Sequence, residues 1–276
     1  MPCGAQFITE NAMKRILLFA GLMLIAASMS HAAIQEKEVT YSANGTALKG
    51  YIAYDDAIKG KRPGILVVHE WWGHNEYARR RAYMLAKYGY TALALDMYGD
   101  GKQAHHPDDA RKFSSEVSQN APLARARFEA ALNLLKQEKS VDDANIGAIG
   151  YCFGGSVVLN MARAGLPLKA VASFHGGLGT QQPAERGKVQ ARIASFTGED
   201  DPMIPATQVA AFRQEMEKAG VNYKAVTYPG ATHAFTNPAA DEYGRKFKLP
   251  LAYNAVADKA SWDAGLAFLA EAFKRK

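Results

Sequence analysis

The sequence contains little cysteine. Its 276 residues include two cysteines, Cys3 and Cys152. A disulfide framework is therefore excluded as the basis of the fold. Because Cys3 lies in an N-terminal segment that we expect to be removed, Cys152 is the single thiol expected in the mature chain. A lone thiol in an oxidising compartment is a liability unless it is buried or used.

Other classes of protein are disfavoured by what is missing. Lys and Arg exceed Asp and Glu only modestly, 33 against 27, and no basic run is interleaved with aromatic residues, so no nucleic acid partner is expected. Arg79-Arg80-Arg81, the densest basic cluster, is interpreted as a solvated helix face, with attraction of anions left open. No Pro/Gly/Ser-rich linker, internal repeat or low-complexity tract divides the chain, so we expect one domain over 33–276.

The N-terminus has the pattern of a secretory signal peptide. Lys14-Arg15 precede the apolar run 16–27, and small residues allow a cut after Ala32. Residues 13–32 are therefore predicted to direct export, to the periplasm, with 1–12 an extension if translation begins at Met13. The run is short for a bilayer span, so a permanent anchor is the weaker alternative and no stable membrane insertion is expected after cleavage.

Strand-like and helix-like segments alternate after this leader, which is typical of an α/β fold with a mostly parallel sheet and helices on both faces. A ligand site is then expected beyond the carboxyl ends of the strands. The expected strands are 39–43, 48–54, 65–68, 91–95, 146–150, 170–174, 192–196 and 223–228. The expected helices are 77–88, 107–117, 122–137, 153–164, 205–219 and 255–273.

Cys152 lies at the centre of a G-x-C-x-G turn. Gly150-Tyr151-Cys152-Phe153-Gly154-Gly155 follows the apolar run 146–149, which is the pattern of a nucleophile elbow with sulfur in place of a serine oxygen. The helix expected after the turn would point its positive end at the sulfur and favour thiolate. The alternative is that Cys152 is a small buried hydrophobe.

Two later loops offer partners for this thiol. Asp201 follows one expected strand and His233 follows another, so the order Cys152, Asp201, His233 is the nucleophile, acid, histidine order of α/β-hydrolases. Asp200 is a competing acid. The end of the strand 65–68 is where this fold places part of an oxyanion hole, so we assign the hole to the backbone amides of Trp71 and Phe153.

Together these motifs resemble the dienelactone hydrolase family over nearly all of 34–276. They are H-E-x-x-G from His69, G-Y-C-x-G-G from Gly150, G-x-x-D-x-x-x-P from Gly198 and the histidine loop from Gly230. The resemblance implies that Cys152 attacks a lactone or ester carbonyl, His233 moves protons, Asp201 orients His233, and Glu70 helps to control the protonation of the thiol. It implies no metal and no organic cofactor.

The sequence departs from this family around the substrate. Members acting on an anionic dienelactone carry an arginine four residues after the histidine, where this chain has Asn237, and the loop after Tyr98 reads Gly99-Asp100. Neutral lactones or small esters are therefore the expected substrates, unless a distant arginine enters the pocket; the candidates are Arg79, Arg80, Arg81, Arg125 and Arg127. Trp72, Tyr98 and Phe235 are candidate pocket residues, although core packing is an equal alternative.

Rival interpretations remain open at this point. His74, His105 and His106 lack organised partners, so solvated histidines are expected and a metal site is not. The chain could also be a binding-only or inactive member of its fold, or a hydrolase of thioesters or amides. The natural substrate and the oligomeric state do not follow from the sequence.

Overall fold

The computed structural model describes residues 34–274, which contain an eight-stranded sheet in the order β1-β2-β4-β3-β5-β6-β7-β8. The first two strands pair antiparallel around the Asn44-Gly45 turn, β2 pairs antiparallel with β4, and the remaining neighbours are parallel. The strands are β1 (Ile34–Ala43), β2 (Thr46–Asp55), β3 (Arg62–Val68), β4 (Thr91–Leu95), β5 (Val141–Tyr151), β6 (Ala170–Phe174), β7 (Arg192–Gly198) and β8 (Tyr223–Tyr228).

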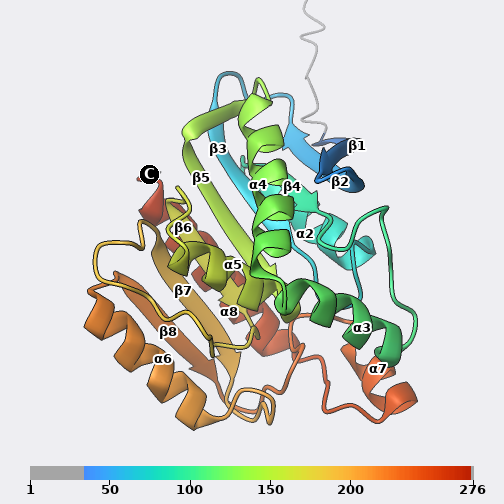
Figure 1. Cartoon of the computed structure of the whole chain (residues 1–276), viewed down its shortest axis with the longest axis vertical. Coiled ribbons are helices and arrows are strands. Elements are labelled where there is room, and N and C mark those ends of the chain that lie inside the picture. The colour runs from blue at the N-terminus through green and yellow to red at the C-terminus, as the bar shows by residue number, and fades with distance from the viewer. Residues whose placement is uncertain (1–33, 275–276) are drawn as a thin grey trace, which may run out of the picture.

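Helices cover both faces of this sheet (Figure 1). They are α2 (Glu76–Lys87), α3 (Pro107–Ser118), α4 (Ala121–Gln137), α5 (Phe153–Arg163), α6 (Ala206–Ala219), α7 (Ala240–Phe247) and α8 (Ala255–Ala272). The buried side chains of α4, α5 and α6 belong to one core cluster, and those of α2 and α8 belong to a second. The sheet is therefore a central layer between two layers of helices.

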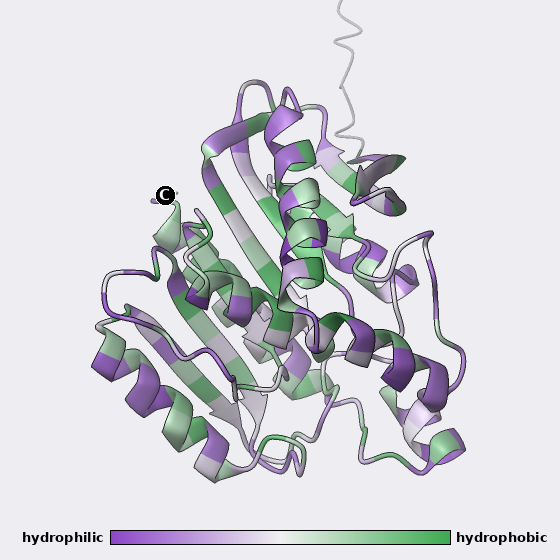
Figure 2. Cartoon of the chain, in the orientation of Figure 1, coloured by the Kyte–Doolittle hydropathy of each residue, from purple (hydrophilic) through white to green (hydrophobic). Residues whose placement is uncertain are grey.

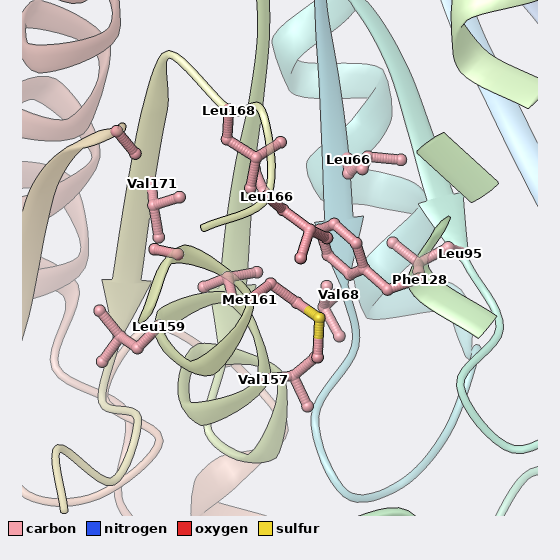
Figure 3. Close-up of a cluster of buried hydrophobic side chains, with 14 of the residues drawn as sticks. Leu66, Val68, Leu95, Phe128, Val157, Leu159, Met161, Leu166, Leu168 and Val171 are labelled. Atoms are coloured by element: carbon pink, nitrogen blue, oxygen red, sulfur yellow. The ribbon is translucent and has the colours of Figure 1, made fainter. Parts of the chain in front are cut away.

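The alternation of side chains along β3 explains why the sheet has two cores. Leu66 and Val68 pack into the cluster under α4 and α5, whereas Ile65 and Val67 pack into the cluster under α2 and α8. All four are fully buried. Figure 3 shows part of the first cluster, with Phe128, Val157 and Met161 around Leu66 and Val68. In Figure 2 the strands inside are mainly apolar, while polar residues recur along the outer helices.

The predicted α/β-hydrolase fold is confirmed, with its mostly parallel sheet and helices on both faces. The main differences from the expected elements concern two strands and one helix. The strands predicted over 39–43 and 146–150 each begin five residues earlier, at Ile34 and Val141, and α7 was not predicted at all. The expected leader and the extension before it, 1–32, lie outside the described residues.

The strand order indicates where a ligand site is expected. After β3, the next strand β4 pairs on one side of it and β5 pairs on the other. Such a reversal leaves room for a ligand outside the carboxyl ends of the strands. His69 follows β3, and Cys152 follows β5, so both predicted motifs lie at this reversal.

Candidate active site

The turn at Cys152 requires its flanking glycines. Cys152 has φ 52° and ψ −116°, a strained conformation that persists only where the surroundings hold it. A Cβ on Gly150 would lie 2.1 Å from the Gly154 carbonyl oxygen, and a Cβ on Gly154 would lie 2.4 Å from the carbonyl oxygen of Val68. The glycine frame therefore lets the turn close against β3 and presents Cys152, which is partly exposed, at the start of α5.

Three of the predicted residues form one hydrogen-bonded chain. His233 Nε2 lies 3.1 Å from Cys152 Sγ, and His233 Nδ1 lies 2.8 Å from Asp201 Oδ2. Asp201 and His233 are 3% and 4% exposed. Asp200 is exposed, so the structure brings Asp201, not the competing acid, to the histidine. A thiol, an imidazole and an orienting carboxylate in this order can generate and hold a nucleophilic thiolate.

The charges around His233 favour its protonated form. Burial alone lowers the pKa of an imidazole, but the negative charges of Cys152 and Asp201 and the hydrogen bonds to both outweigh it, raising the pKa of His233 to about 10. At neutral pH this favours an imidazolium beside the sulfur. Such a cation is the partner that a thiolate needs.

Glu70 lies inside the protein beside Asn237. The amide of Asn237 donates to Glu70 Oε2 across 2.6 Å, while Oε1 accepts from no group in the described part of the chain. Burial raises the pKa of Glu70 to about 7, although Asn237, His233 and Arg81 each favour the ionised form. Near neutral pH the carboxyl therefore exists in both protonation states.

The amide of Trp71 is oriented by a buried histidine. His69 Nδ1 lies 2.6 Å from the carbonyl oxygen of Glu70, and the Met97 amide donates to His69 Nε2. His69 Nδ1 therefore carries the proton and donates it to that carbonyl. Because the carbonyl and the next N–H point in opposite directions across a trans peptide, this bond turns the Trp71 N–H away from His69. Phe153 begins α5, where helical N–H groups have no partner within the helix.

The three aromatic residues predicted to line the substrate pocket are all buried. Phe235 is fully buried between Tyr228 and His175, so its assignment to a substrate pocket was wrong. Trp72 is covered by Tyr243 of α7, with ring centroids 4.4 Å apart, and Tyr98 donates from its hydroxyl to the Trp71 carbonyl. Trp71 itself is partly exposed.

The contacts of three residues near the site were missed from the sequence. Tyr243, whose pKa is raised by burial and further by the Glu70 charge, lies on the unpredicted helix α7. Asn237 had no predicted partner. His175 is fully buried and follows β6 directly, before Gly176-Gly177. The available signal was a polar residue directly after a buried strand with two glycines close behind it, because Cys152 has a similar setting.

Two predictions about basic residues are corrected. His74 is not solvated: it is 1% exposed and lies 3.1 Å from the Ala94 carbonyl oxygen, and burial lowers its pKa to about 4. Arg81 does not belong to a solvated helix face. It is 3% exposed and pairs with Asp258 at 2.6 Å. Within 34–274 no cluster of three or more His, Cys, Asp or Glu side chains is arranged to hold a metal ion.

Comparisons with known proteins agree on one family. The sequence model of the Dienelactone hydrolase family matches residues 48–273. A candidate carboxymethylenebutenolidase of Synechocystis is 32% identical over 71% of this chain and 85% of its own length. Protein usf of Aquifex pyrophilus is 27% identical over 84% of this chain and 97% of its own.

Solved structures give the same result. A promiscuous phosphotriesterase from metagenomic libraries, described as similar to dienelactone hydrolase, is 32% identical with a TM-score of 0.80, covering 87% of this chain and 99% of its own. The structure named m3DLH is 34% identical with a TM-score of 0.83 over the same shares. The chain therefore belongs to the dienelactone hydrolase family and is a hydrolase of the lactone and ester class.

Proposed function

We propose that this hydrolase cleaves uncharged lactones or small carboxylic esters through a thioester on Cys152. The observation that carries the proposal is the continuous chain from Cys152 Sγ through His233 to Asp201, at 3.1 and 2.8 Å. A binding-only protein has no need of a thiol, an imidazole and a buried carboxylate in this order, so the geometry favours turnover.

In the proposed reaction the Cys152 thiolate attacks the carbonyl carbon and forms a C–S bond. The carbonyl oxygen becomes an oxyanion, held by the N–H groups of Trp71 and Phe153. When the intermediate collapses, the C–O bond breaks and the His233 imidazolium gives its proton to the leaving alkoxide. A lactone opens at this step and stays attached through its acyl group.

Water completes the cycle. Neutral His233 takes a proton from the water that attacks the thioester, and collapse of the second oxyanion releases the carboxylic acid and regenerates the thiolate–imidazolium pair. Asp201 holds the imidazole so that Nε2 faces the sulfur throughout. Glu70, whose pKa is raised to about 7, is proposed to help control the protonation of the thiol through its own charge.

The surroundings of the site support an uncharged substrate. Four of the five arginines considered from the sequence already have a partner in the described chain, and the fifth is exposed. Arg81 is buried and pairs with Asp258, and Arg127 is buried and donates to the Met97 carbonyl oxygen. Arg79 pairs with Glu38, and Arg125 pairs with Glu129. Arg80 is exposed on α2. Trp71 and Tyr243, both partly exposed, are the proposed walls of the pocket, and the buried Trp72 and Tyr98 support Trp71.

Export is part of the proposal. Lys14-Arg15, the apolar run 16–27 and the small residues before Ala33 support a signal peptide over 13–32 and a periplasmic location for 33–276. Within 34–274 no helix has the length and apolar character needed to cross a bilayer.

The direct test compares the purified protein with Cys152→Ala on 4-nitrophenyl acetate, a five-membered lactone, an acyl thioester and a simple amide. Wild type is expected to cleave the ester and the lactone, and Cys152→Ala to be inactive. An acyl group located on Cys152 by peptide mapping after a rapid quench would be the thioester itself. Ester cleavage retained in Cys152→Ala would exclude the mechanism, and binding of lactone without cleavage would favour a binding-only protein.

A further inference from the structure

His175 is a buried histidine outside the Cys152–His233–Asp201 chain. It follows β6 directly, is fully buried, and has φ 40°. This left-handed conformation is costly for a residue other than glycine and persists only where the surroundings hold it. Its position between β5 and β7 places it beside the turn that carries Cys152.

The hydrogen bonds of His175 fix its tautomer. The backbone N–H of Cys152 donates to His175 Nδ1 at 3.1 Å, as well as to the Phe174 carbonyl oxygen at 3.0 Å. Because a backbone amide only donates, Nδ1 carries no proton and the proton is on Nε2. Nε2 lies 2.7 Å from Thr236 Oγ1 and donates a hydrogen bond to it.

Thr236, the partner of His175 Nε2, is itself held by hydrogen bonds to α2. Thr236 Oγ1 is hydrogen-bonded to the hydroxyl of Tyr77, and Arg81 donates both to that hydroxyl and to the Thr236 carbonyl oxygen. Arg81 is held in turn by its ion pair with Asp258. His175 therefore rests on a network that joins α2, α8 and the loop after β8.

This arrangement ties together the two loops of the site. Thr236 stands three residues after His233, so one imidazole links the turn of Cys152 to the loop of His233. We propose that His175 is a positioning residue, whose unprotonated Nδ1 holds the Cys152 amide so that the strained turn keeps Sγ within reach of His233 Nε2. The inference rests on the proposed role of Cys152 as nucleophile.

The same contacts exclude a proton-transfer role. Both ring nitrogens of His175 are engaged, and its ring meets that of His233 edge to face with centroids 5.4 Å apart, without a hydrogen bond between them. Burial, helped by the nearby positive His233, holds the pKa of His175 well below the ordinary value. A proton on Nδ1 would also face the Cys152 N–H donor, so the neutral ring suits the contact.

Two substitutions separate positioning from packing. His175→Asn places an amide oxygen near the position of Nδ1 and retains an acceptor for Cys152. His175→Gln places its amide nearer the position of Nε2, retaining a partner for Thr236 but losing that acceptor. Both replace the aromatic ring, and because asparagine tolerates φ 40° better than glutamine, the midpoint of thermal unfolding reports the difference in backbone strain between them. For each variant we would measure kcat, KM, the midpoint of thermal unfolding, and the pH profile of iodoacetamide alkylation mapped to Cys152.

His175→Gln is expected to lower kcat about 10- to 100-fold with KM within about threefold, because a small displacement of a reacting atom has this effect. His175→Asn should stay within about fivefold of wild type, and alkylation of Cys152 near neutral pH should follow the same order. Equal losses in both variants, in step with their unfolding midpoints, would overturn the proposal, as would no loss in His175→Gln.

Alkylation needs no ester substrate, which keeps the two proposals distinguishable. If the wild type cleaves no ester or lactone but His175→Gln still slows alkylation and His175→Asn restores it, the proposed function fails and the positioning role holds. If ester cleavage depends on Cys152 while alkylation and kcat are the same in all three proteins, the positioning role fails and the proposed function holds.

Discussion

The side-chain amide of Asn237 donates a hydrogen bond to the carboxyl of Glu70 across 2.6 Å, between two residues that are both almost fully buried. An amide is a weaker counterpart than a guanidinium, because it carries no charge. Burial therefore dominates at Glu70 and raises its pKa to about 7. The Glu70 carboxyl is therefore partly neutral near pH 7.

Glu70→Gln should stabilise the protein more at pH 8 than at pH 5. The folded pKa, about 7, exceeds the ordinary value of 4.5, so the folded chain binds the proton more tightly and the free energy of unfolding falls as pH rises between these values. Glutamine removes this loss, giving an expected gain of roughly 2–3 kcal/mol at pH 8. Denaturant unfolding at both pH values measures it.

The matched control for this experiment is Glu242→Gln, which neutralises an exposed carboxylate on α7. Its stability relative to wild type should be the same at pH 5 and pH 8 within about 0.5 kcal/mol. A Glu70→Gln variant that behaves like this control would show that Glu70 is ionised throughout, and that burial does not govern its pKa.

The sequence predicted the parts of the site that local patterns encode. Glycines that prevent backbone collisions flank Cys152. Asp201 and His233 each lie in a loop that follows a strand. The motifs and their positions at strand ends could therefore both be recognised from the sequence. All but one of the elements followed from apolar runs and their breaks. The exception, α7, is only eight residues long, so its apolar positions Ala240, Tyr243 and Phe247 span about two turns, too few for a helical period to be recognised.

The remaining contacts depend on pairs that are distant in the chain. Glu70 and Asn237 are 167 positions apart, and Arg81 and Asp258 are 177 apart. Helical spacing places Arg81, four residues after Tyr77, on the buried face of α2, but it does not reveal the ion pair with Asp258. His175 shows the same limit, since its tautomer depends on Cys152 and Thr236 together.

Asp201→Asn should lower kcat by roughly a thousandfold or more, because an amide cannot stabilise the imidazolium and can hold the wrong tautomer. Asp200→Asn is the matched control, one residue away and exposed, and should change kcat less than about twofold. Steady-state kinetics on one ester measures both. The reverse order of effects would mean that Asp200 is the functional acid.

At pH 7 Cys152 should react with iodoacetamide faster in the wild type than in His233→Asn. The pKa of His233 is raised to about 10, so its positive charge is present beside the sulfur at this pH, and a neighbouring cation favours the reactive thiolate. Alkylation rates of the two proteins, mapped to Cys152, measure the difference. Equal rates would mean that no thiolate–imidazolium pair forms.

The exported protein should begin at Ala33, because a charged start, an apolar run and small residues at the cleavage site occur in order. Intact-mass measurement of periplasmic material reads this terminus directly. A variant with Ala32→Arg should be cleaved poorly and accumulate with its leader attached. Recovery of residues 13–32 with the wild-type protein in a membrane fraction would instead identify the segment as an anchor.

Neutral lactones and short-chain esters should be cleaved with a higher kcat/KM than a carboxylate-bearing dienelactone of similar size. A charge-assisted contact to a substrate carboxylate contributes about 1.5–3 kcal/mol, so its absence should cost the anionic substrate roughly 10- to 100-fold. Asn237→Arg should shift the ratio of the two kcat/KM values toward the anionic substrate, while Asn237→Gln should not. A clear preference of the wild type for the anionic dienelactone would refute the neutral-pocket proposal and leave the role of Cys152 untouched.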